Sequence, residues 1–282
     1  MALRPLPSLS GRRVVITGAA RGIGAALARR LTERGARVAV AGLEPELLEK
    51  VAADCGGPWW PCDVTDRASV DAVVDAAADA FGGLDVVVAN AGVAAQLPIV
   101  DGDPAIFERT VAVNLLGAYY TLRAGGRHVA HPGGYALAIS SLAAAVHVPL
   151  LGAYSASKAG VEALGNTLRT ELRPSGGRVG VAYFAELDTD MTSRGFGTEA
   201  ARAFFGGGRG AVTGVTALSV GIDALERGIA RRSRWVWAPW WVGGALPVRS
   251  AVQPIVDRVA QRHLPEVLRI ARDERVELTT PQ

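Results

Sequence analysis

Tyr154 and Lys158 are the pair of residues in this 282-residue chain that most directly suggests chemistry. Residues four apart on a helix share one face, so this spacing would put an ammonium group about one turn from a phenol. A nearby positive charge favours the phenolate, so the pairing predicts a tyrosine pKa below its ordinary value of about 10. The chain has 28 Arg but only two Lys, Lys50 and Lys158, so a lysine here is not the default cation. Taken alone, the pair is also compatible with a surface tyrosine and a solvated lysine.

The elements that would position this pair follow a regular alternation of short apolar runs and longer helical patterns. Runs rich in β-branched or apolar residues predict strands at residues 12–17, 37–41, 59–62, 84–89, 135–140, 178–184 and 235–238. Helical spacing predicts helices at residues 25–34, 45–54, 66–81, 107–131, 154–172 and 215–232. This alternation is typical of a single doubly wound parallel sheet, Rossmann-like, with helices on both faces.

Glycine or polar residues come at or just after the ends of five of these strands. They are Gly18, Asp63, Asn90, Ser141 and Thr189. In open parallel sheets ligands bind beyond the carboxyl ends of the strands, so we expect these residues to share one site with the helix that carries Tyr154. The glycines between the first strand and the first helix would let helix amides approach a pyrophosphate.

With these motifs in place, the chain resembles the short-chain dehydrogenase/reductase family from about residue 12 to residue 191. Its cofactor-binding motifs are matched by Thr17-Gly18-x-x-x-Gly22-Ile23-Gly24, by Asp63-Val64 and by Asn90-Ala91-Gly92. The family's catalytic tetrad is matched by Asn114, Ser141, Tyr154 and Lys158. Ser141 matches better than Ser140, because thirteen residues separate it from Tyr154, as is usual in the family.

The resemblance implies hydride transfer between a nicotinamide and a carbinol or carbonyl carbon. Tyr154 would be the general acid in reduction and the general base in oxidation. Lys158 would lower the pKa of Tyr154 and hold the nicotinamide ribose, and Ser141 would hydrogen-bond the substrate oxygen. Asn114 would connect Lys158 to solvent through an ordered water. The structural alternatives are a strand-end cap for Ser141 and a helix kink for Asn114.

Two departures from the family pattern affect the cofactor. Phe184-Ala185 replaces the usual Pro-Gly, although Thr189, the implied nicotinamide contact, stands at the usual distance. Gly42 stands where NAD-preferring members carry an acid, with Leu43 and Glu44 after it. Without a carboxylate at Gly42, Arg21 could pair with a 2′-phosphate, so we expect NADP(H) to be favoured over NAD(H). The alternative for Arg21 is a solvated loop cation.

The chain divides into an expected catalytic core, residues 1–233, and a C-terminal extension, residues 234–282. Within the core, the Gly-rich segment at about 188–215 would close over the substrate, with Phe196, Phe204 and Phe205 as an apolar lining. We therefore expect a small hydrophobic ketone or secondary alcohol, such as a lipid, steroid or terpenoid. The extension would hold the final strand, a Trp cluster and a basic amphipathic helix at 248–275, interrupted by Pro254 and Pro265. It could rest on a membrane surface. Packing over the substrate site or a neighbouring subunit is the favoured alternative.

Composition narrows the remaining function classes. The net charge of +3 is concentrated after residue 225, and aromatic residues are not interleaved with basic ones, so we expect no nucleic-acid partner. Cys55 and Cys62 are too few for a disulfide framework, and we expect no metal site. Residues 1–11 lack the apolar segment of a signal peptide, and two cysteines fit a reducing compartment, so we expect a cytoplasmic protein. We also expect a homodimer or homotetramer. The alternatives are a catalytically silent nucleotide-sensing homologue and a nucleotide-sugar epimerase or dehydratase.

Overall fold

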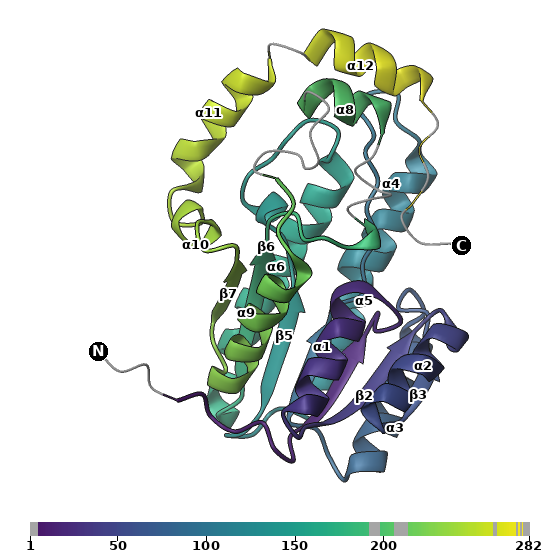
Figure 1. Cartoon of the computed structure of the whole chain (residues 1–282), viewed down its shortest axis with the longest axis vertical. Helices are drawn as coiled ribbons and strands as arrows, with labels where there is room; N and C mark the ends of the chain where they lie inside the picture. Colours follow the sequence, from purple (N-terminus) through teal and green to yellow (C-terminus); the bar gives the residue numbers. More distant parts are fainter. Residues whose placement is uncertain are drawn as a thin grey trace.

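The computed structural model describes residues 5–191, 198–205, 214–261, 264–274, 276 and 278. Seven parallel strands form one sheet in the order β3-β2-β1-β4-β5-β6-β7 (Figure 1). The strands are β1 (Arg13–Thr17), β2 (Arg37–Gly42), β3 (Trp59–Pro61), β4 (Val86–Ala89), β5 (Tyr135–Ile139), β6 (Arg178–Phe184) and β7 (Trp235–Ala238). The chain runs outward from β1 to β3 and then returns to β4 on the other side of β1, so the expected doubly wound parallel sheet is confirmed.

Helices cover both faces of this sheet. The helices of the described residues are α1 (Gly22–Glu33), α2 (Pro45–Cys55), α3 (Arg67–Phe81), α4 (Pro104–Val111), α5 (Gly117–Gly126), α6 (Gly152–Glu171), α8 (Glu199–Phe205), α9 (Leu218–Arg231), α10 (Val242–Ala245), α11 (Arg249–Ala260) and α12 (Leu264–Asp273). Alternate strand residues point to opposite faces: Val14 and Ile16 pack with α1, α2 and α9, whereas Val15 packs with α3, α5 and α6. Both faces are therefore apolar, which explains why the strands read as continuous apolar runs.

Element boundaries follow local side-chain chemistry. Asp66 and Asp103 begin α3 and α4, because each carboxylate accepts a hydrogen bond from the backbone amide two residues on, 2.9 Å away. The strand expected from residue 84 begins only at Val86. The residue before it, Asp85, donates its amide to the carbonyl oxygen of Arg13 at 2.9 Å, and its carboxylate accepts the backbone amide of Arg13 at 3.0 Å and pairs with that guanidinium. A side chain thus replaces a strand hydrogen bond at this end.

The helix expected at 107–131 is shorter and irregular. It begins at Pro104, contains a π-helical turn at Ala112–Leu116 and ends at Gly126. Gly125 allows α5 to lie close to the sheet, because a Cβ there would lie 2.5 Å from the side chain of Val87. This close approach explains a glycine inside a helix, where it is otherwise unfavourable.

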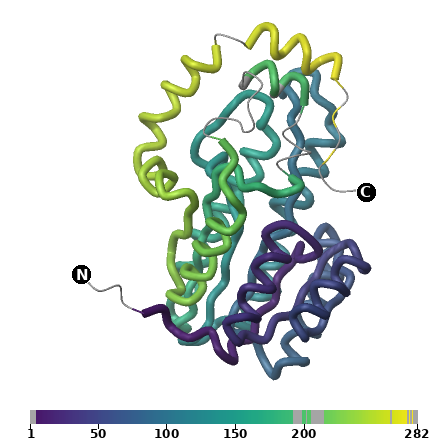
Figure 2. The backbone as a smooth tube through the Cα atoms, viewed as in Figure 1, coloured from purple at the N-terminus to yellow at the C-terminus, as the bar shows by residue number. Residues whose placement is uncertain are grey.

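The C-terminal segment runs along one side of the molecule and then over the end where α8 lies (Figure 2). The predicted interruption at Pro254 is wrong, because α11 continues through that residue. The predicted interruption at Pro265 is confirmed, because α11 ends at Ala260 and α12 begins at Leu264, with Pro265 as its second residue, where a missing amide is tolerated. Val267 and Ala271 of α12 are buried against α8, and Glu274 accepts the backbone amides of Glu199 and Ala200 at the start of α8. Within the described ranges, no helix is long and apolar enough to cross a membrane.

Candidate active site

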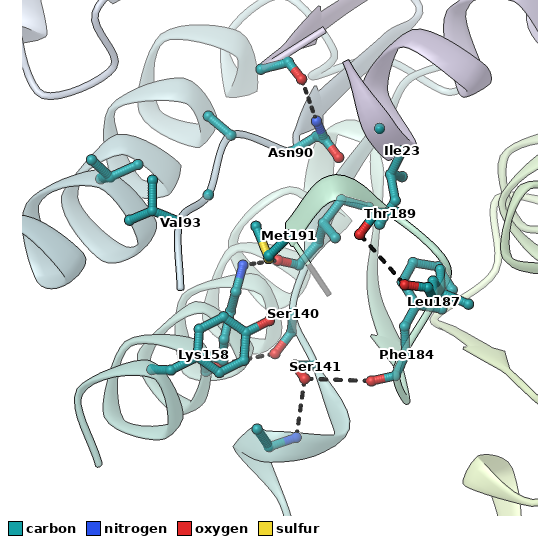
Figure 3. A pocket seen from close by; sticks show the side chains of 18 of the residues that line it. Ile23, Asn90, Val93, Ser140, Ser141, Lys158, Phe184, Leu187, Thr189 and Met191 are labelled. Atoms are coloured by element: carbon teal, nitrogen blue, oxygen red, sulfur yellow. Dashed lines mark hydrogen bonds between the residues drawn. The ribbon is translucent and has the colours of Figure 1, made fainter. Parts of the chain in front are cut away.

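A cavity of about 370 Å³ lies at the carboxyl ends of the strands and extends from the first turn of α1 to α11. Figure 3 shows part of its lining, with Lys158, Ser141 and Thr189 around the same space. The cavity brings together most of the predicted site residues: Gly18, Arg21, Gly22, Ile23, Asp63, Val64, Asn90, Ala91, Gly92, Ser141, Tyr154, Lys158 and Thr189. Gly24 and Asn114, also predicted, are not in its lining: Gly24 packs against Gly18, and Asn114 is fully buried.

The glycine turn after β1 is fixed by close backbone packing. Gly18 has a φ of 65°, and a Cβ there would lie 2.5 Å from the Cα of Ala91. A Cβ on Gly24 would lie 2.5 Å from the carbonyl oxygen of Gly18. Asn90 joins the turn to the end of β4, since its Nδ2 donates to the carbonyl oxygens of Thr17 and Gly18 at 3.0 and 2.9 Å. These contacts hold the turn in one shape beside the cavity.

The first turn of α1 is open to the cavity. A Cβ placed on Gly22 would meet only the Cγ2 of Thr189, at 4.0 Å. Among the described residues, no side chain caps this end of α1, and its first turn contains no acid. Free amides at a helix N-terminus favour an anion. The turn therefore fits the pyrophosphate of a nicotinamide dinucleotide, with Gly22 leaving the space it would need.

Asp63 and Val64 form the opposite part of this groove. The Asp63 carboxylate accepts the backbone amide and the hydroxyl of Thr65, at 2.9 and 2.7 Å, and so holds the turn after β3. Val64 is buried beside Gly117, where a Cβ would lie 2.7 Å from the valine Cγ2. The loop after β3 is thus anchored against the start of α5.

Arg21 is not the solvated cation that the sequence left as an alternative. Its Nε donates to Glu44 Oε2 at 2.8 Å, and a second guanidinium nitrogen pairs with the other oxygen of the same carboxylate. A third contact joins Arg21 to Asp190, 3.6 Å away. Glu44 and Asp190 also line the cavity and were not predicted as site residues. Any 2′-phosphate that binds Arg21 must therefore compete with Glu44.

Tyr154 is buried in the first turn of α6, and burial raises its pKa while a hydrogen bond with Ser141 opposes that rise. The predicted lowering of the Tyr154 pKa by Lys158 is therefore wrong. Lys158 Nζ lies 5.7 Å from the centre of the Tyr154 ring and donates to the carbonyl oxygen of Ile139 at 3.0 Å. Burial lowers the pKa of Lys158 to about 8. Desolvation outweighs the attraction that the sequence suggested.

The two adjacent serines have different partners. Ser140 Oγ donates to the carbonyl oxygen of Lys158 at 2.8 Å and so ties β5 to α6. Ser141 Oγ accepts the amide of Ala143 at 3.1 Å and donates to the carbonyl oxygen of Phe184 at 3.4 Å (Figure 3). Ser141 therefore caps the turn at Leu142–Ala144, in agreement with the structural alternative to its catalytic role. It is also the serine that hydrogen-bonds Tyr154.

Asn114 braces the site from behind. It lies fully buried in the π-helical turn, where its Oδ1 accepts the amide of Val93 at 2.8 Å. Its Nδ2 donates to the carbonyl oxygen of Val93 and to Ser157 Oγ, at 2.9 and 3.1 Å. A Cβ on Gly92 would lie 3.3 Å from Asn114 Oδ1 and 3.4 Å from Lys158 Nζ, so Gly92 lets the two side chains approach each other.

The far end of the cavity is apolar and is built largely from residues that the sequence did not assign to the site. They include Leu142, Val146, Val148, Met191, Trp241, Val252 and Val256. Val252 and Val256 are four apart on α11, and that spacing was the available signal. The expectation for Phe204 is wrong, since it packs against α12 with Leu150, Val267 and Ala271. Phe196 and the side chain of Phe205 lie outside the described residues.

Phe184-Ala185, the departure from the family's Pro-Gly, continues the sheet at this end. Phe184 is buried and aligned with Ala238 of β7, and the amide of Ala185 donates to the carbonyl oxygen of Ala238 at 3.0 Å. Both residues line the cavity. The pairing of β6 and β7 thus continues to the cavity edge through the amide of Ala185, which stands at the position of the family's Gly.

The chain matches a family model described as short chain dehydrogenase over residues 12–208. It is 39% identical over 177 residues to a D-threitol dehydrogenase of Mycolicibacterium smegmatis, covering 61% of this chain and 68% of that protein. It is 38% identical over 188 residues to a cis-4-hydroxycyclohexanecarboxylate dehydrogenase of Sinomonas cyclohexanicum, covering 64% of this chain and 76% of that protein. It is also 36% identical over 193 residues to (-)-isopiperitenol/(-)-carveol dehydrogenase, mitochondrial, of Mentha piperita, covering 66% and 73%.

The solved structures agree with this likeness. A putative short-chain alcohol dehydrogenase from Sinorhizobium meliloti 1021 superposes with a TM-score of 0.72 at 31% identity, over 85% of this chain and 99% of that one. A short-chain type dehydrogenase/reductase from Mycobacterium marinum gives a TM-score of 0.60 at 32% identity, over 64% and 76%. The family model ends at residue 208, so α9 to α12 lie beyond the part of the chain that it matches.

Proposed function

Since this chain belongs to the short-chain dehydrogenase/reductase family, and is an oxidoreductase that uses NAD(P)(H) and acts on CH–OH groups, we propose that it interconverts a hydrophobic secondary alcohol and its ketone. One observation carries the proposal. Tyr154, Ser141 and Lys158 line the same cavity as the open first turn of α1, and the lining that Leu142, Val146, Val148, Met191, Trp241, Val252 and Val256 add to it is apolar. The relative named for isopiperitenol and carveol supports a terpenoid-like substrate, whereas the one named for D-threitol acts on a polyol.

When bound, the nicotinamide supplies or accepts the hydride. In reduction, the Tyr154 hydroxyl donates a proton to the substrate oxygen, and its high pKa in the buried site keeps it protonated for that step. Ser141 hydrogen-bonds the same oxygen, where negative charge develops. Lys158, which is buried within reach of the Tyr154 ring, holds the ribose hydroxyls, and Asn114 keeps the Val93 loop and α6 in register behind it.

The experiment is a panel of ketones and secondary alcohols with each nicotinamide, followed by reduced-cofactor absorbance. Tyr154→Phe should abolish turnover and leave the cofactor dissociation constant, measured by tryptophan fluorescence, unchanged. Near-full turnover by this variant would remove Tyr154 from the proposed role. The alternative, a catalytically silent nucleotide-sensing homologue, predicts that the wild type binds cofactor but turns over none of the panel.

For the cofactor, we propose that NADP(H) is favoured over NAD(H). Gly42 carries no carboxylate, and a 2′-phosphate would replace Glu44 as the partner of Arg21. Glu44→Gln should then raise the kcat/KM ratio of NADP⁺ to NAD⁺, because the competing charge is gone. A higher kcat/KM for NAD⁺ than for NADP⁺ in the wild type contradicts the preference.

The proposal extends to assembly and location. A homodimer or homotetramer is supported by the exposed side chains of Phe107, Leu116 and Tyr119 along α4, the π-helical turn and α5, and light scattering would test it. A reducing cytoplasm is supported by the thiols of Cys55 and Cys62, which are buried and free, and fractionation of cells would test it. We also propose the split into a core, 1–233, and an extension, 234–282; the family model ends at residue 208, so the extension lies beyond the part of the chain that it matches.

A further inference from the structure

The apolar stripe of α11 is broader than the face that this helix buries. Val252 and Val256 line the cavity and Ala260 is buried. Ile255 and Val259 continue the stripe beyond the buried face, and their exposed fractions are 66% and 65%. A helix that only covers a pocket needs apolar side chains on its buried face and polar ones on the face toward water. The exposed part of the stripe therefore calls for another partner.

The segments that lead into α11 carry exposed tryptophans. β7 is the edge strand of the sheet, and its Trp235 and Trp237 are both exposed. Trp240, just before α10, is 85% exposed. β7, α10 and α11 follow one another along one side of the molecule (Figures 1 and 2). We call this surface the β7–α11 edge and define it by Trp235, Trp237, Trp240, Val248, Ile255 and Val259.

Positive charge accompanies this apolar surface. Residues 231–261 contain five Arg and one acid, Asp257. The Arg234 guanidinium lies 4.6 Å from the centre of the Trp235 ring. Burial, and secondarily the charge of Arg234, lower the pKa of Arg169. On the neighbouring α6, Glu162 is paired with Arg249 at 2.9 Å. The edge is therefore apolar and cationic together.

This combination distinguishes between two occupants. A second copy of the chain would bring the same arginines against one another, whereas anionic lipid headgroups complement them. Tryptophan and arginine side chains also suit a membrane interface, because each has an apolar body and a polar end. We propose that the β7–α11 edge docks on the surface of an anionic membrane. The helix that contacts the lipid would then also form a wall of the apolar cavity, through Val252 and Val256.

The test is flotation of the full chain with phosphatidylcholine vesicles, with and without phosphatidylglycerol. The wild type should bind the phosphatidylglycerol vesicles and dissociate as salt is added. Replacing Ile255 and Val259 together by Ser should weaken binding about tenfold, because two apolar side chains no longer enter the interface. Trp240→Ala should weaken it too, and this highly exposed position leaves the core intact if the double variant misfolds.

Ile99 and Val100 provide the matched control, because they are 82% and 67% exposed in a loop elsewhere on the chain. Replacing both by Ser should leave vesicle binding unchanged. The proposal is overturned if the wild type does not bind phosphatidylglycerol vesicles, or if the control pair loses binding equally. It is also overturned if light scattering shows a wild-type oligomer that the Ile255/Val259 variant dissociates, since a second copy would then be the occupant. None of these outcomes depends on turnover.

Discussion

Replacing Lys158 by Met should stabilise the ligand-free protein at pH 7, and the gain should disappear at high pH. Burial lowers the pKa of Lys158 from 10.5 to about 8. Each pKa unit corresponds to about 1.4 kcal/mol, so the folded protein carries a cost of about 3 kcal/mol for holding the charged form below pH 8. The lost hydrogen bond to the carbonyl oxygen of Ile139 offsets about 1 kcal/mol or more of the gain.

The pH dependence has a definite sign. Between about pH 8 and pH 10.5 the unfolded chain still holds the lysine proton and the folded protein does not, so the wild-type free energy of unfolding rises with pH. A methionine side chain does not titrate, so the difference between wild type and Lys158→Met changes by about 3 kcal/mol across this window. Groups that titrate alike in both proteins contribute equally to the two free energies of unfolding, so they cancel in this difference.

Urea denaturation of both proteins at a series of pH values measures this difference. Lys50, the chain's other lysine, is exposed on α2, so Lys50→Met controls for loss of a solvated lysine. A difference between Lys158→Met and wild type that stays constant across the window would refute the assignment of a desolvated ammonium at Lys158.

Three further changes test other parts of the site. Ser141→Ala should lower kcat about a hundredfold at unchanged cofactor affinity, since one hydrogen bond to the developing charge is lost, and an equal loss of cofactor binding would argue for the cap alone. Gly18→Ala should lower the free energy of unfolding by about 1–3 kcal/mol more than Gly56→Ala, because both have a positive φ but only Gly18 faces the Ala91 backbone; equal losses in urea melts would contradict the packing argument. Glu274→Gln should cost about 1 kcal/mol in the same assay, through the weakened cap of α8, whereas Glu266→Gln on the exposed side of α12 should cost little; similar costs for the two would argue against the cap.

Much of the fold was predictable because the strands are buried on both sides. Val14, Val15 and Ile16 are all buried, so periodicity could not assign their faces, but the continuous apolar run still indicated a parallel strand. The glycines of the first turn were predictable for the same local reason, since a tight turn between a strand and a helix needs them. The apolar run and the glycine turn are both local patterns, formed by residues that are close together in the sequence.

What the sequence could not provide depends on contacts between distant residues. Burial of Tyr154 and Lys158 is produced by the surrounding fold, so the spacing of the pair predicted the wrong direction for the tyrosine pKa. The pairing of Arg21 with Glu44 likewise depends on how β2 ends beside α1. Val252 and Val256 reach the cavity only because the chain returns over it after β7. The place of α11 next to the cavity therefore required the tertiary structure.

The contact of Glu274 with the start of α8 has a consequence for the order in which the protein matures. The carboxylate follows Glu199 by 75 residues, so a ribosome must add all of them before α8 receives its cap. Until then the apolar wall behind α8 stays open to chaperones and proteases. The C-terminal position of Leu278, which also lines the cavity, matters for the placement of a purification tag. A purification tag joined directly after it would crowd the cavity wall, whereas a tag joined ahead of residue 5 would leave that wall untouched.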